Sequence, residues 1–543
     1  MFDPTASPAP RKARLLASVL AGVIGLAAFA AHAAAPLPPP RVSLADGRIE
    51  GKLAKANGMA LEEFQGIPYA APPIGALRWK PPQPAPAWSG VRQATRFGPR
   101  CMQLPLFGDM RFRSAGMGED CLYLNVWKPA GATARLPVLV YFFGGGFVAG
   151  DGSEPRYDGA SLASRGIVTV TVNYRLGVFG FFATPALAAE SPQHAAGNYG
   201  LLDQVAALRW VRDNIAAFGG DPAQVTIAGE SAGSIAVSAL MTSPLSRGLF
   251  ARAIGESGAL IAPIAPVPLA TMERRGEAFA QRLGADSLTA LRALPADRLL
   301  QATREQHGDA DANLDGWFLR EPPAATMARG GQAPVPLLLG SNSQEDHYTA
   351  ILKDQPPTPA NYRAALKRLF GTQAAHALAL YPGDDATQVK SSATALAGDM
   401  FIAHTTWRWM DLQRRHGGAP VYFYYFDQPR PAKLAPAPGE TPDPGAVHSG
   451  EIEYALGNLA GNPVYAWTAA DRAASATMEG YFAQFIKTGD PNGADLPPWP
   501  AVRESAGGLL RQVIAAHCRT EVDHGAARQA FLQAFFATHA DPL

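Results

Sequence analysis

One five-residue motif in this sequence has the composition of an exposed nucleophile. Residues 229–233 read GESAG, after the β-rich run 224–228 and at the start of the helical run 232–241. In that context G-x-S-x-G predicts a tight strand-to-helix turn, which holds Ser231 in a strained conformation with its hydroxyl above a sheet. The helix N-terminus behind the turn favours negative charge. The alternative is a chance match, and the strand and helix around the motif favour the catalytic interpretation.

A serine hydroxyl is a weak nucleophile, so it needs a base, and the base needs a residue that orients it. For a serine on such a turn, the order along the chain is serine, acid, histidine. The sequence must therefore supply a carboxylate after a later strand, and then a histidine.

A run of glycines precedes the nucleophile. Residues 141–150 read YFFGGGFVAG, in which strand-forming residues end in three consecutive glycines. Acyl transfer builds an oxyanion, which needs preorganised N–H donors. The amides of Gly145 and Gly146 can approach a substrate closely because no Cβ intervenes, and the amide of Ala232 would be a third donor. We therefore predict an oxyanion hole, the alternative being a flexible glycine loop.

The elements that must position these groups alternate along the chain. Apolar runs predict buried strands, and helical periodicity over 201–218 ends at a Gly-Gly-Asp-Pro stop. The alternation indicates an α/β fold with a mostly parallel sheet flanked by helices. Residues 259–332 look mainly helical and indicate a cap or insertion, whereas 67–86 and 431–444 are rich in proline and predict irregular structure. The predicted strands are 136–143, 167–174, 224–228, 335–340 and 421–426.

The N-terminus has the pattern of a targeting segment. Three basic residues precede the apolar run 15–30, and Ala31-His32-Ala33 follows as a small-x-small cleavage site. We predict a signal peptide over 1–33, with cleavage after Ala33 or Ala35, and a single domain over 34–543. The alternative is an uncleaved anchor, but the run is short for a membrane span. The protein is therefore expected in the periplasm or the medium.

Composition limits the remaining classes of partner. The chain has 543 residues, 47% of them hydrophobic and 17% charged, and a net charge of +1. Nothing here indicates a nucleic acid or an anionic membrane surface as partner. Cys101 and Cys121 could close a loop in an oxidising compartment, which would leave Cys518 as a single buried thiol.

Five segments of the chain have the character of family signatures. They are FQGIPYAAPPIGALRWKPPQP (64–84), EDCLYLNVW (119–127), NYRLGVFGF (173–181), GNYGLLDQVAALRWVRDNIAAFGGDPAQVTIAGESAGS (197–234) and FIKTGDPN (485–492). Through them the chain resembles the type B carboxylesterase family, the cholinesterase-like branch of the α/β hydrolases. The resemblance implies an α/β-hydrolase fold with a central mixed sheet and a deep active-site gorge, and it implies no metal and no organic cofactor.

The resemblance also implies roles for residues far from the motif. GAVHSGEIEYALG (445–457) resembles the family's histidine motif and makes His448 the general base and acid, with Glu451 a structural carboxylate. GSNSQEDHYTA (340–350) follows a strand and resembles the segment that carries the acid, which maps to Glu345. The family disulfide maps to Cys101 and Cys121.

The chain departs from the family pattern at several positions. Gln344 and Asp346 stand where the family usually has Asp and Gly, so Asp346 remains a rival acid. Phe143 stands where many relatives have His or Tyr, which puts in doubt a side-chain hydrogen bond to the oxyanion hole.

The loop between Cys101 and Cys121 contains no Trp, so a quaternary ammonium site is poorly supported. It contains Arg111 and Arg113 instead, which could meet an acidic acyl group or be solvated surface charges.

Together these observations predict an exported serine carboxylesterase that hydrolyses a small-molecule ester through Ser231, Glu345 and His448. Hydrolysis of an amide or carbamate uses the same groups and stays open. A non-catalytic binding module is the other alternative.

Overall fold

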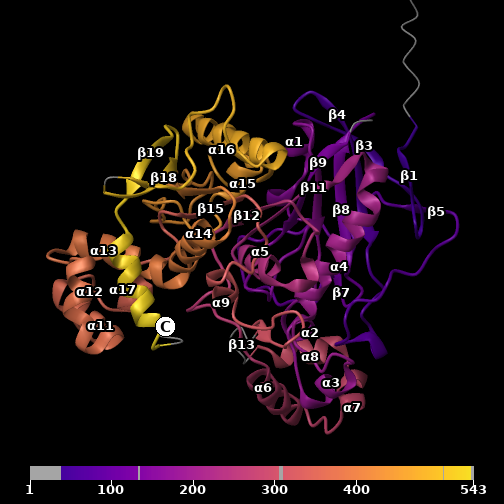
Figure 1. Cartoon of the computed structure of the whole chain (residues 1–543), viewed down its shortest axis with the longest axis horizontal. Helices are drawn as coiled ribbons and strands as arrows, with labels where there is room; N and C mark the ends of the chain where they lie inside the picture. The colour runs from indigo at the N-terminus through magenta and orange to yellow at the C-terminus, as the bar shows by residue number, and fades with distance from the viewer. Residues whose placement is uncertain (1–37, 133–134, 305–309, 506, 540–543) are drawn as a thin grey trace, which may run out of the picture. The chain divides into compact units, whose positions relative to one another are not determined.

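A twelve-stranded mixed sheet organises the protein in the computed structural model (Figure 1). The six pairings from β10 to β18 are parallel, and the strands outside this region pair antiparallel. In spatial order the strands are β17 (Glu504–Ser505), β18 (Gly508–Ile514), β16 (Val421–Phe426), β15 (Leu337–Asn342), β12 (Arg252–Glu256), β11 (Gly220–Glu230), β9 (Leu136–Phe142), β10 (Val168–Val172), β8 (Tyr123–Pro129), β4 (Met59–Pro68) and β3 (Lys52–Ala56), while β19 (Arg519–Asp523) pairs with β18.

The structure describes residues 38–132, 135–304, 310–505 and 507–539. Residues from Pro39 onward form one compact unit, and the signal peptide predicted at 1–33 lies outside the described residues. Within those ranges, none of the helices has the length and apolar composition needed to cross a membrane.

All five predicted strands are central strands of this sheet, and four of them have shifted ends. Only β16 keeps its predicted bounds; β9 ends at Phe142 and β10 covers Val168–Val172. Strand β11 begins four residues before the predicted start, and β15 is displaced toward the C-terminus. The outer antiparallel strands were not predicted. The longest of them, β4 and β8, are mostly buried but include charged and polar residues such as Glu62, Glu63 and Asn125, so their sequences lack a continuous apolar run.

Helices cover both faces of the sheet. The chain steps in one direction along the sheet from β9 to β10 and in the opposite direction from β10 to β11 and from β11 to β12. Because β-α-β crossovers are right-handed, the helix that follows β9 lies on one face and the helices that follow β10 and β11 lie on the other. On the first face α1 (Ala160–Ser164) and α16 (Ala469–Thr488) are joined by a hydrogen bond from Ser161 to Glu479 (2.6 Å). On the second face are α4 (Tyr199–Asn214), α5 (Ala232–Thr242) and α14 (His404–His416).

The predicted helical insertion lies between β12 and β15. It is mainly helical, as expected, and it also contains the short parallel pair β13 (Val267–Pro268) and β14 (Asn313–Leu314). Its helices are α6 (Leu269–Arg282), α7 (Leu288–Ala293), α8 (Ala296–Ala302) and α9 (Pro323–Ala328).

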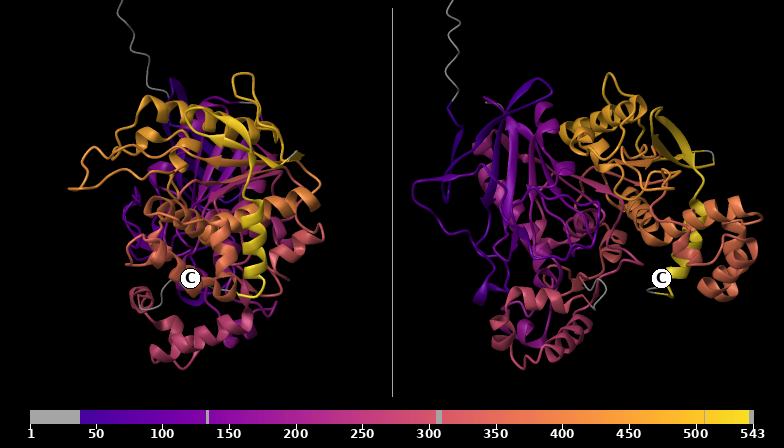
Figure 2. Two further views of the ribbon diagram at one scale, coloured as in Figure 1. Left: turned by 90° about the vertical axis from the view of Figure 1, so that its left-hand side faces the viewer. Right: turned by 180° about the vertical axis from the view of Figure 1, so that it is seen from behind.

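A second helical group was not predicted from the sequence. It consists of helices that lie between β15 and β16 along the chain, together with the C-terminal helix that packs against them (Figure 2). It has its own apolar cluster, in which Tyr362, Leu396 and Leu532 are fully buried. A π-helical turn at Asp399–Ala403 leads from it into α14. The helices are α10 (Thr349–Leu352), α11 (Pro359–Phe370), α12 (Ala374–Leu380), α13 (Ala386–Gly398) and α17 (Ala526–Phe536).

The remaining elements are short. The Pro-rich stretch 67–86 consists of the end of β4, a 3-10 turn at Gly75–Leu77 and irregular backbone, as predicted. The others are β1 (Arg41–Leu44), β2 (Gly47–Glu50), β5 (Val91–Gln93), β6 (Arg100–Cys101), β7 (Met117–Gly118), α2 (Gly177–Gly180), α3 (Pro185–Glu190), α15 (Ile452–Ala455) and the 3-10 turns Pro155–Tyr157, Ile215–Phe218, Pro244–Ser246, Gly371–Gln373 and Leu459–Gly461.

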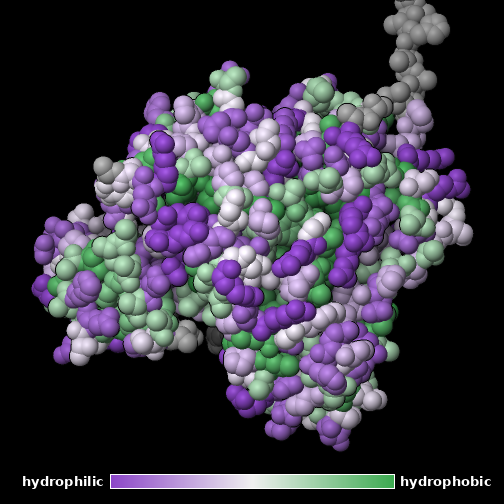
Figure 3. Space-filling model, in the orientation of Figure 1, coloured by the Kyte–Doolittle hydropathy of each residue, from purple (hydrophilic) through white to green (hydrophobic). Residues whose placement is uncertain are grey.

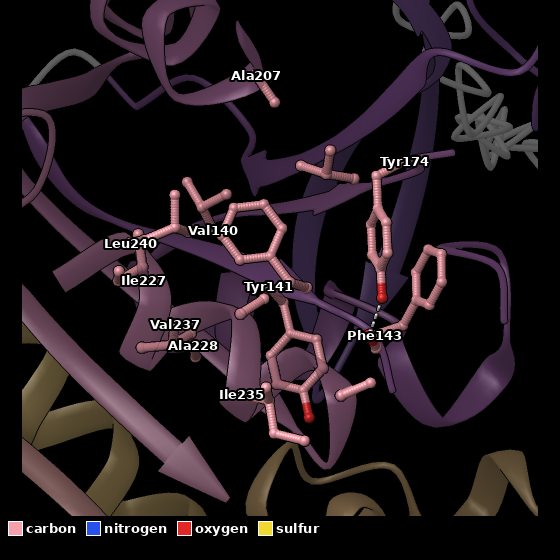
Figure 4. Packing of buried hydrophobic residues seen from close by; sticks show 14 of the residues in the cluster. Val140, Tyr141, Phe143, Tyr174, Ala207, Ile227, Ala228, Ile235, Val237 and Leu240 are labelled. Atoms are coloured by element: carbon pink, nitrogen blue, oxygen red, sulfur yellow. Dashed lines mark hydrogen bonds between the residues drawn. The ribbon is translucent and has the colours of Figure 1, made fainter. Parts of the chain in front are cut away.

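The main core sits where the central strands meet α5. Val140 of β9 and Ile227 of β11 are register partners, both fully buried, and Val237 and Leu240 of α5 belong to the same cluster (Figure 4). This packing anchors the end of β11, where the candidate nucleophile lies. On the outside, hydrophilic and apolar residues are interspersed over the face shown in Figure 3.

Candidate active site

Ser231 occupies the turn between β11 and α5. Its backbone has φ 53° and ψ −120°, a conformation that non-glycine residues rarely adopt, so the turn is strained as the motif predicts. A Cβ added to Gly233 would lie 2.0 Å from the carbonyl oxygen of Phe142, and one added to Gly229 would lie 2.5 Å from the Gly233 backbone. Both glycines of the motif are therefore needed for close backbone approach.

His448 connects the serine to a carboxylate. Its Nε2 lies 2.9 Å from Ser231 Oγ, and its Nδ1 lies 2.7 Å from Glu345 Oε2. The His448 side chain is 22% exposed, whereas that of Glu345 is 1% exposed. The structure thus brings together three residues that are separated by more than 100 positions along the chain.

Glu345 is held from its other oxygen. Glu345 Oε1 accepts hydrogen bonds from the Ser257 hydroxyl and the Asn342 amide, both at 2.6 Å. The rival acid points elsewhere, since Asp346 Oδ1 accepts from the amide of His347. Of the two candidates, Glu345 is the one in contact with the histidine.

Three further glutamates are buried in or beside the site, and two of them, Glu230 and Glu256, were not predicted to belong to it. Glu230 Oε1 lies 3.3 Å from His448 Nε2 and accepts a hydrogen bond from Ser449. Glu451, expected to be structural, accepts from the side-chain amide of Asn342, and Glu256 accepts from the Tyr141 hydroxyl. Its position inside the G-x-S-x-G motif was the one feature of the sequence that could have placed Glu230 near the site. Glu256 had no sequence signal.

These carboxyls set the electrostatics of the site. Burial lowers the pKa of His448, but attraction to Glu230 and the hydrogen bond to Glu345 outweigh it and raise that pKa to about 9. Burial, and then repulsion from Glu230 and Glu345, raise the pKa of Glu451 to about 8. The site therefore favours a positively charged imidazole.

The glycine run passes close to Ser231. A Cβ at Gly144 would lie 2.6 Å from the Glu230 carbonyl oxygen and 3.1 Å from Ser231 Cβ. Gly145 and Gly146 have φ 107° and 62°, and in the described part of the chain neither N–H donates a hydrogen bond. Both amides are thus free donors next to the serine.

Phe143 fixes the start of this loop through its backbone. Its ring stacks on Tyr174 with centroids 4.4 Å apart, and the Tyr174 hydroxyl donates to the Phe143 carbonyl oxygen at 2.6 Å (Figure 4). The residue that departs from the family pattern therefore packs against an aromatic neighbour.

The predicted disulfide between Cys101 and Cys121 is present. The loop that it closes covers the glycine run, because the methyl carbon of Met110 would lie 2.8 Å from a Cβ at Gly145. The side chain of Gln103 also bonds both backbone groups of Gly150, at 2.8 and 2.9 Å.

The two arginines of this loop differ in their surroundings. Arg113 pairs with Asp158 and donates to the Ser153 carbonyl oxygen, both at 2.6 Å, so it holds the loop in place. Arg111 lines a cavity.

The prediction of a buried thiol at Cys518 needs correction. Cys518 is a free thiol but only half-buried, because it lies in the turn between β18 and β19.

Two cavities flank the Met110 region of the loop. One, of about 290 Å³, is mainly apolar and is lined by Leu104, Leu106 and Val148 together with helices α2 and α6. The other, of about 210 Å³, is lined by Gly108, Asp109 and Arg111 and by charged residues from later segments.

A sheet of this topology, with a serine on the turn after its central strand, defines the α/β-hydrolase class. The chain belongs to the carboxylesterase family, whose model matches residues 38–524. It is accordingly a carboxylic ester hydrolase that acts on small-molecule esters.

Known relatives are of similar length and come from bacteria and mammals. The fumonisin B1 esterase of Sphingopyxis macrogoltabida is 36% identical over 533 residues, covering 91% of this chain and 92% of the relative. The liver carboxylesterase of Sus scrofa is 35% identical over 548 residues, covering 89% and 91%. The cocaine esterase of Oryctolagus cuniculus is 36% identical over 493 residues, covering 84% and 88%.

Proposed function

We propose that this protein is an exported serine carboxylesterase in which Ser231, His448 and Glu345 act as the catalytic triad. The observation that carries the proposal is the position of His448, with one ring nitrogen 2.9 Å from Ser231 Oγ and the other 2.7 Å from Glu345. These are hydrogen-bond distances of the kind that proton transfer from a serine requires.

In the proposed reaction Ser231 Oγ attacks the ester carbonyl carbon while His448 Nε2 takes the hydroxyl proton. The amides of Gly145, Gly146 and Ala232 receive the oxyanion of the tetrahedral intermediate. The C–O bond to the alcohol then breaks, and His448 returns its proton to the leaving oxygen. The same nitrogen next removes a proton from water, which attacks the acyl-enzyme and releases the acid. Glu345 keeps the imidazole oriented and stabilises its charged form.

Export is supported by one feature of the sequence and one feature of the structure. Residues 1–33 have the composition of a signal peptide, and the Cys101–Cys121 disulfide is of the kind that persists in oxidising compartments. We propose cleavage after Ala33 or Ala35 and a single domain over 34–543. We propose a small-molecule ester as the binding partner. We propose no binding to nucleic acid, and none to a membrane once the signal peptide has been removed. N-terminal sequencing of protein released into the periplasm or medium tests the cleavage.

The relatives differ in the substrates that their names give, which include fumonisin B1 and cocaine. Similarity at this level therefore supports the reaction and does not select one ester.

The test compares wild type with Ser231→Ala on p-nitrophenyl esters from acetate to octanoate. We expect turnover by the wild type and a loss of about 10⁴-fold or more in kcat in the variant. Turnover that persists in Ser231→Ala would mean that another residue is the nucleophile. Inertness of folded wild-type protein toward every ester would favour a binding module.

Amide hydrolysis uses the same groups, so it needs its own comparison. The pair p-nitrophenyl acetate and p-nitroacetanilide differs only in the bond to the leaving group. Faster turnover of the ester is expected, and faster turnover of the amide would reassign the reaction.

A further inference from the structure

The cavity of about 210 Å³ beside Met110 is lined by four cationic side chains from three separate segments of the chain. They are Arg111 of the disulfide loop, Arg156 of the segment after the glycine run, and Arg430 and Lys433 of the segment after β16. Cationic side chains repel one another, so their convergence on one cavity needs either internal counter-charges or an anionic ligand.

The internal counter-charges are incomplete. Three carboxyls line the cavity: Asp109 and Glu154 each lie 3.0 Å from Arg156, and Glu453 lies 2.8 Å from Arg430. Burial raises the pKa of Glu154 to about 7 although Arg156 opposes the shift. Among the side chains that line the cavity, the four cations therefore outnumber the three carboxyls, and burial weakens the negative charge of one of these carboxyls.

Arg111 and Lys433 are the two free cations of the cavity, in the sense that neither pairs with a carboxyl that lines it. Arg111 is exposed, and within the described ranges no carboxylate lies within 4.0 Å of its guanidinium. Among the described residues Lys433 pairs with Glu440 alone, which does not line the cavity, in a partly exposed contact of the kind that contributes little and exchanges readily. A guanidinium and an ammonium group together suit a carboxylate, which accepts several hydrogen bonds.

Two contacts join the lining of this cavity to the candidate active site. Asp109 and Arg111 flank Met110, which covers Gly145 of the glycine run. Arg430 donates to the carbonyl oxygen of Ser449 at 3.2 Å, one residue from His448. The cavity is therefore adjacent to the segments that carry the site, and we infer that a long substrate can extend into it.

We propose that this cavity binds a carboxylate carried by the substrate, so that the preferred substrates are esters with a second, ionised carboxyl group. The inference rests on the proposed function and specifies its substrate class. The carboxylate can belong to the acyl half or to the alcohol half of the ester, and the two arms of the experiment separate these sources.

The acyl arm compares mono-p-nitrophenyl glutarate with its carboxamide isostere, p-nitrophenyl 4-carbamoylbutanoate. The alcohol arm compares 4-acetoxybenzoate with 4-acetoxybenzamide. In at least one arm kcat/KM for the carboxylate should exceed that for the amide by about 10-fold, and the preference should shrink at high salt. Equal rates in both arms, or a preference for the amides, would overturn the inference.

The variant Arg111→Gln/Lys433→Gln removes both free cations from the cavity. It should lower the carboxylate-to-carboxamide ratio of kcat/KM about 10-fold. The matched control is Arg363→Gln/Lys367→Gln, which makes the same charge change on the exposed side of α11 and should keep the wild-type ratio. An equal fall in both double variants would assign the effect to net charge and overturn the inference.

Inhibition gives a readout that does not depend on the hydrolysed ester. Glutarate should compete with a neutral ester in the wild type and lose potency in the Arg111→Gln/Lys433→Gln protein. Failure of the wild type to hydrolyse even the neutral esters would overturn the proposed function itself. Hydrolysis of neutral esters without inhibition by glutarate and without a carboxylate preference would overturn only this inference.

Discussion

Glu230 Oε1 lies 3.3 Å from His448 Nε2, the same nitrogen that lies 2.9 Å from Ser231 Oγ. The imidazole is thus placed between two carboxyls, because Glu345 contacts its other nitrogen. Both attract the imidazolium that forms when the histidine accepts a proton. The consequence is that the charged form of His448, the proposed base, is stabilised before any substrate binds.

This arrangement predicts an alkaline pH profile. His448 must be neutral to accept a proton, and its pKa is raised to about 9, so kcat/KM should rise with pH from the ordinary imidazole range up to about 9. In Glu230→Gln one attractive charge is gone, so the pKa of His448 falls and the rising limb moves to lower pH. Profiles of kcat/KM with p-nitrophenyl acetate measure the shift.

Glu277→Gln is the control for that profile, because it makes the same chemical change on the exposed side of α6. The rising limb of its pH profile of kcat/KM should coincide with that of the wild type. A limb that stays in place in Glu230→Gln would show that this carboxyl does not set the pKa of His448.

Glu451 predicts a dependence of stability on pH. Its pKa is about 8 in the folded protein against 4.5 as the reference, so between these values the folded state binds more protons than the unfolded state. Its contribution is therefore fully present below pH 4.5 and is lost as pH rises through 8. In Glu451→Gln the fall of the free energy of unfolding between pH 5 and 8 should be shallower, by at most about 1.4 kcal/mol per pH unit.

Urea unfolding at several pH values gives those free energies. A slope in Glu451→Gln equal to that of the wild type would contradict the raised pKa. Glutamine can still accept the hydrogen bond from Asn342, so the comparison isolates the titration from the loss of the contact.

The choice between the two candidate acids predicts a sharp contrast. Glu345→Gln keeps the shape of the side chain but removes the charge beside His448 Nδ1, and should lower kcat by about 10³–10⁴-fold. Asp346→Asn should retain most of the activity, since the Asp346 side chain bonds only the neighbouring amide of His347 among the described residues. Steady-state kinetics of both variants decide the matter, and the reverse ranking would make Asp346 the acid.

The local parts of this site were predictable, and the distant contacts were not. The turn at Ser231 and the donors at Gly145 and Gly146 follow from short motifs, since each depends on neighbouring residues. The approach of Glu230 to His448 joins residues 218 positions apart and depends on how strands β11 and β16 pack. The hydrophobic periodicity of a segment reports on its local structure and does not predict which distant residues it contacts.

The missed elements have a similar cause. The helices of 349–398 form a separate apolar cluster with α17, so the apolar faces of these helices pack against a helix that is distant in the sequence. The cationic cavity likewise joins Arg111, Arg156 and Arg430, which come from segments up to 319 positions apart. Only the first of these arginines stood out in the sequence, because of its place in the disulfide loop.

The two glycines of the proposed oxyanion hole should respond unequally to alanine. A Cβ at Gly145 would lie 2.3 Å from the Ala149 carbonyl oxygen, so Gly145→Ala must displace the loop and should lower kcat by about 10²–10³-fold. A Cβ at Gly146 meets only Val148, at 3.6 Å, so Gly146→Ala should cost less, mainly through its φ of 62°. Rates with one ester, on proteins of matched melting temperature, test the ranking. Equal losses would show that steric fit of the loop is not what limits activity.

The disulfide should matter to both stability and turnover. Cys101 and Cys121 close a loop whose Met110 rests on Gly145, so opening the loop frees the unfolded chain and loosens the cover of the glycine run. We expect Cys101→Ala/Cys121→Ala to lose about 2–4 kcal/mol of stability and to turn over esters more slowly. Chemical unfolding and kinetics before and after reduction of the wild type provide the measurement. Cys518→Ala is the control, because this free thiol lies outside the loop. A reduced wild type that keeps full activity while losing stability would limit the role of the disulfide to folding.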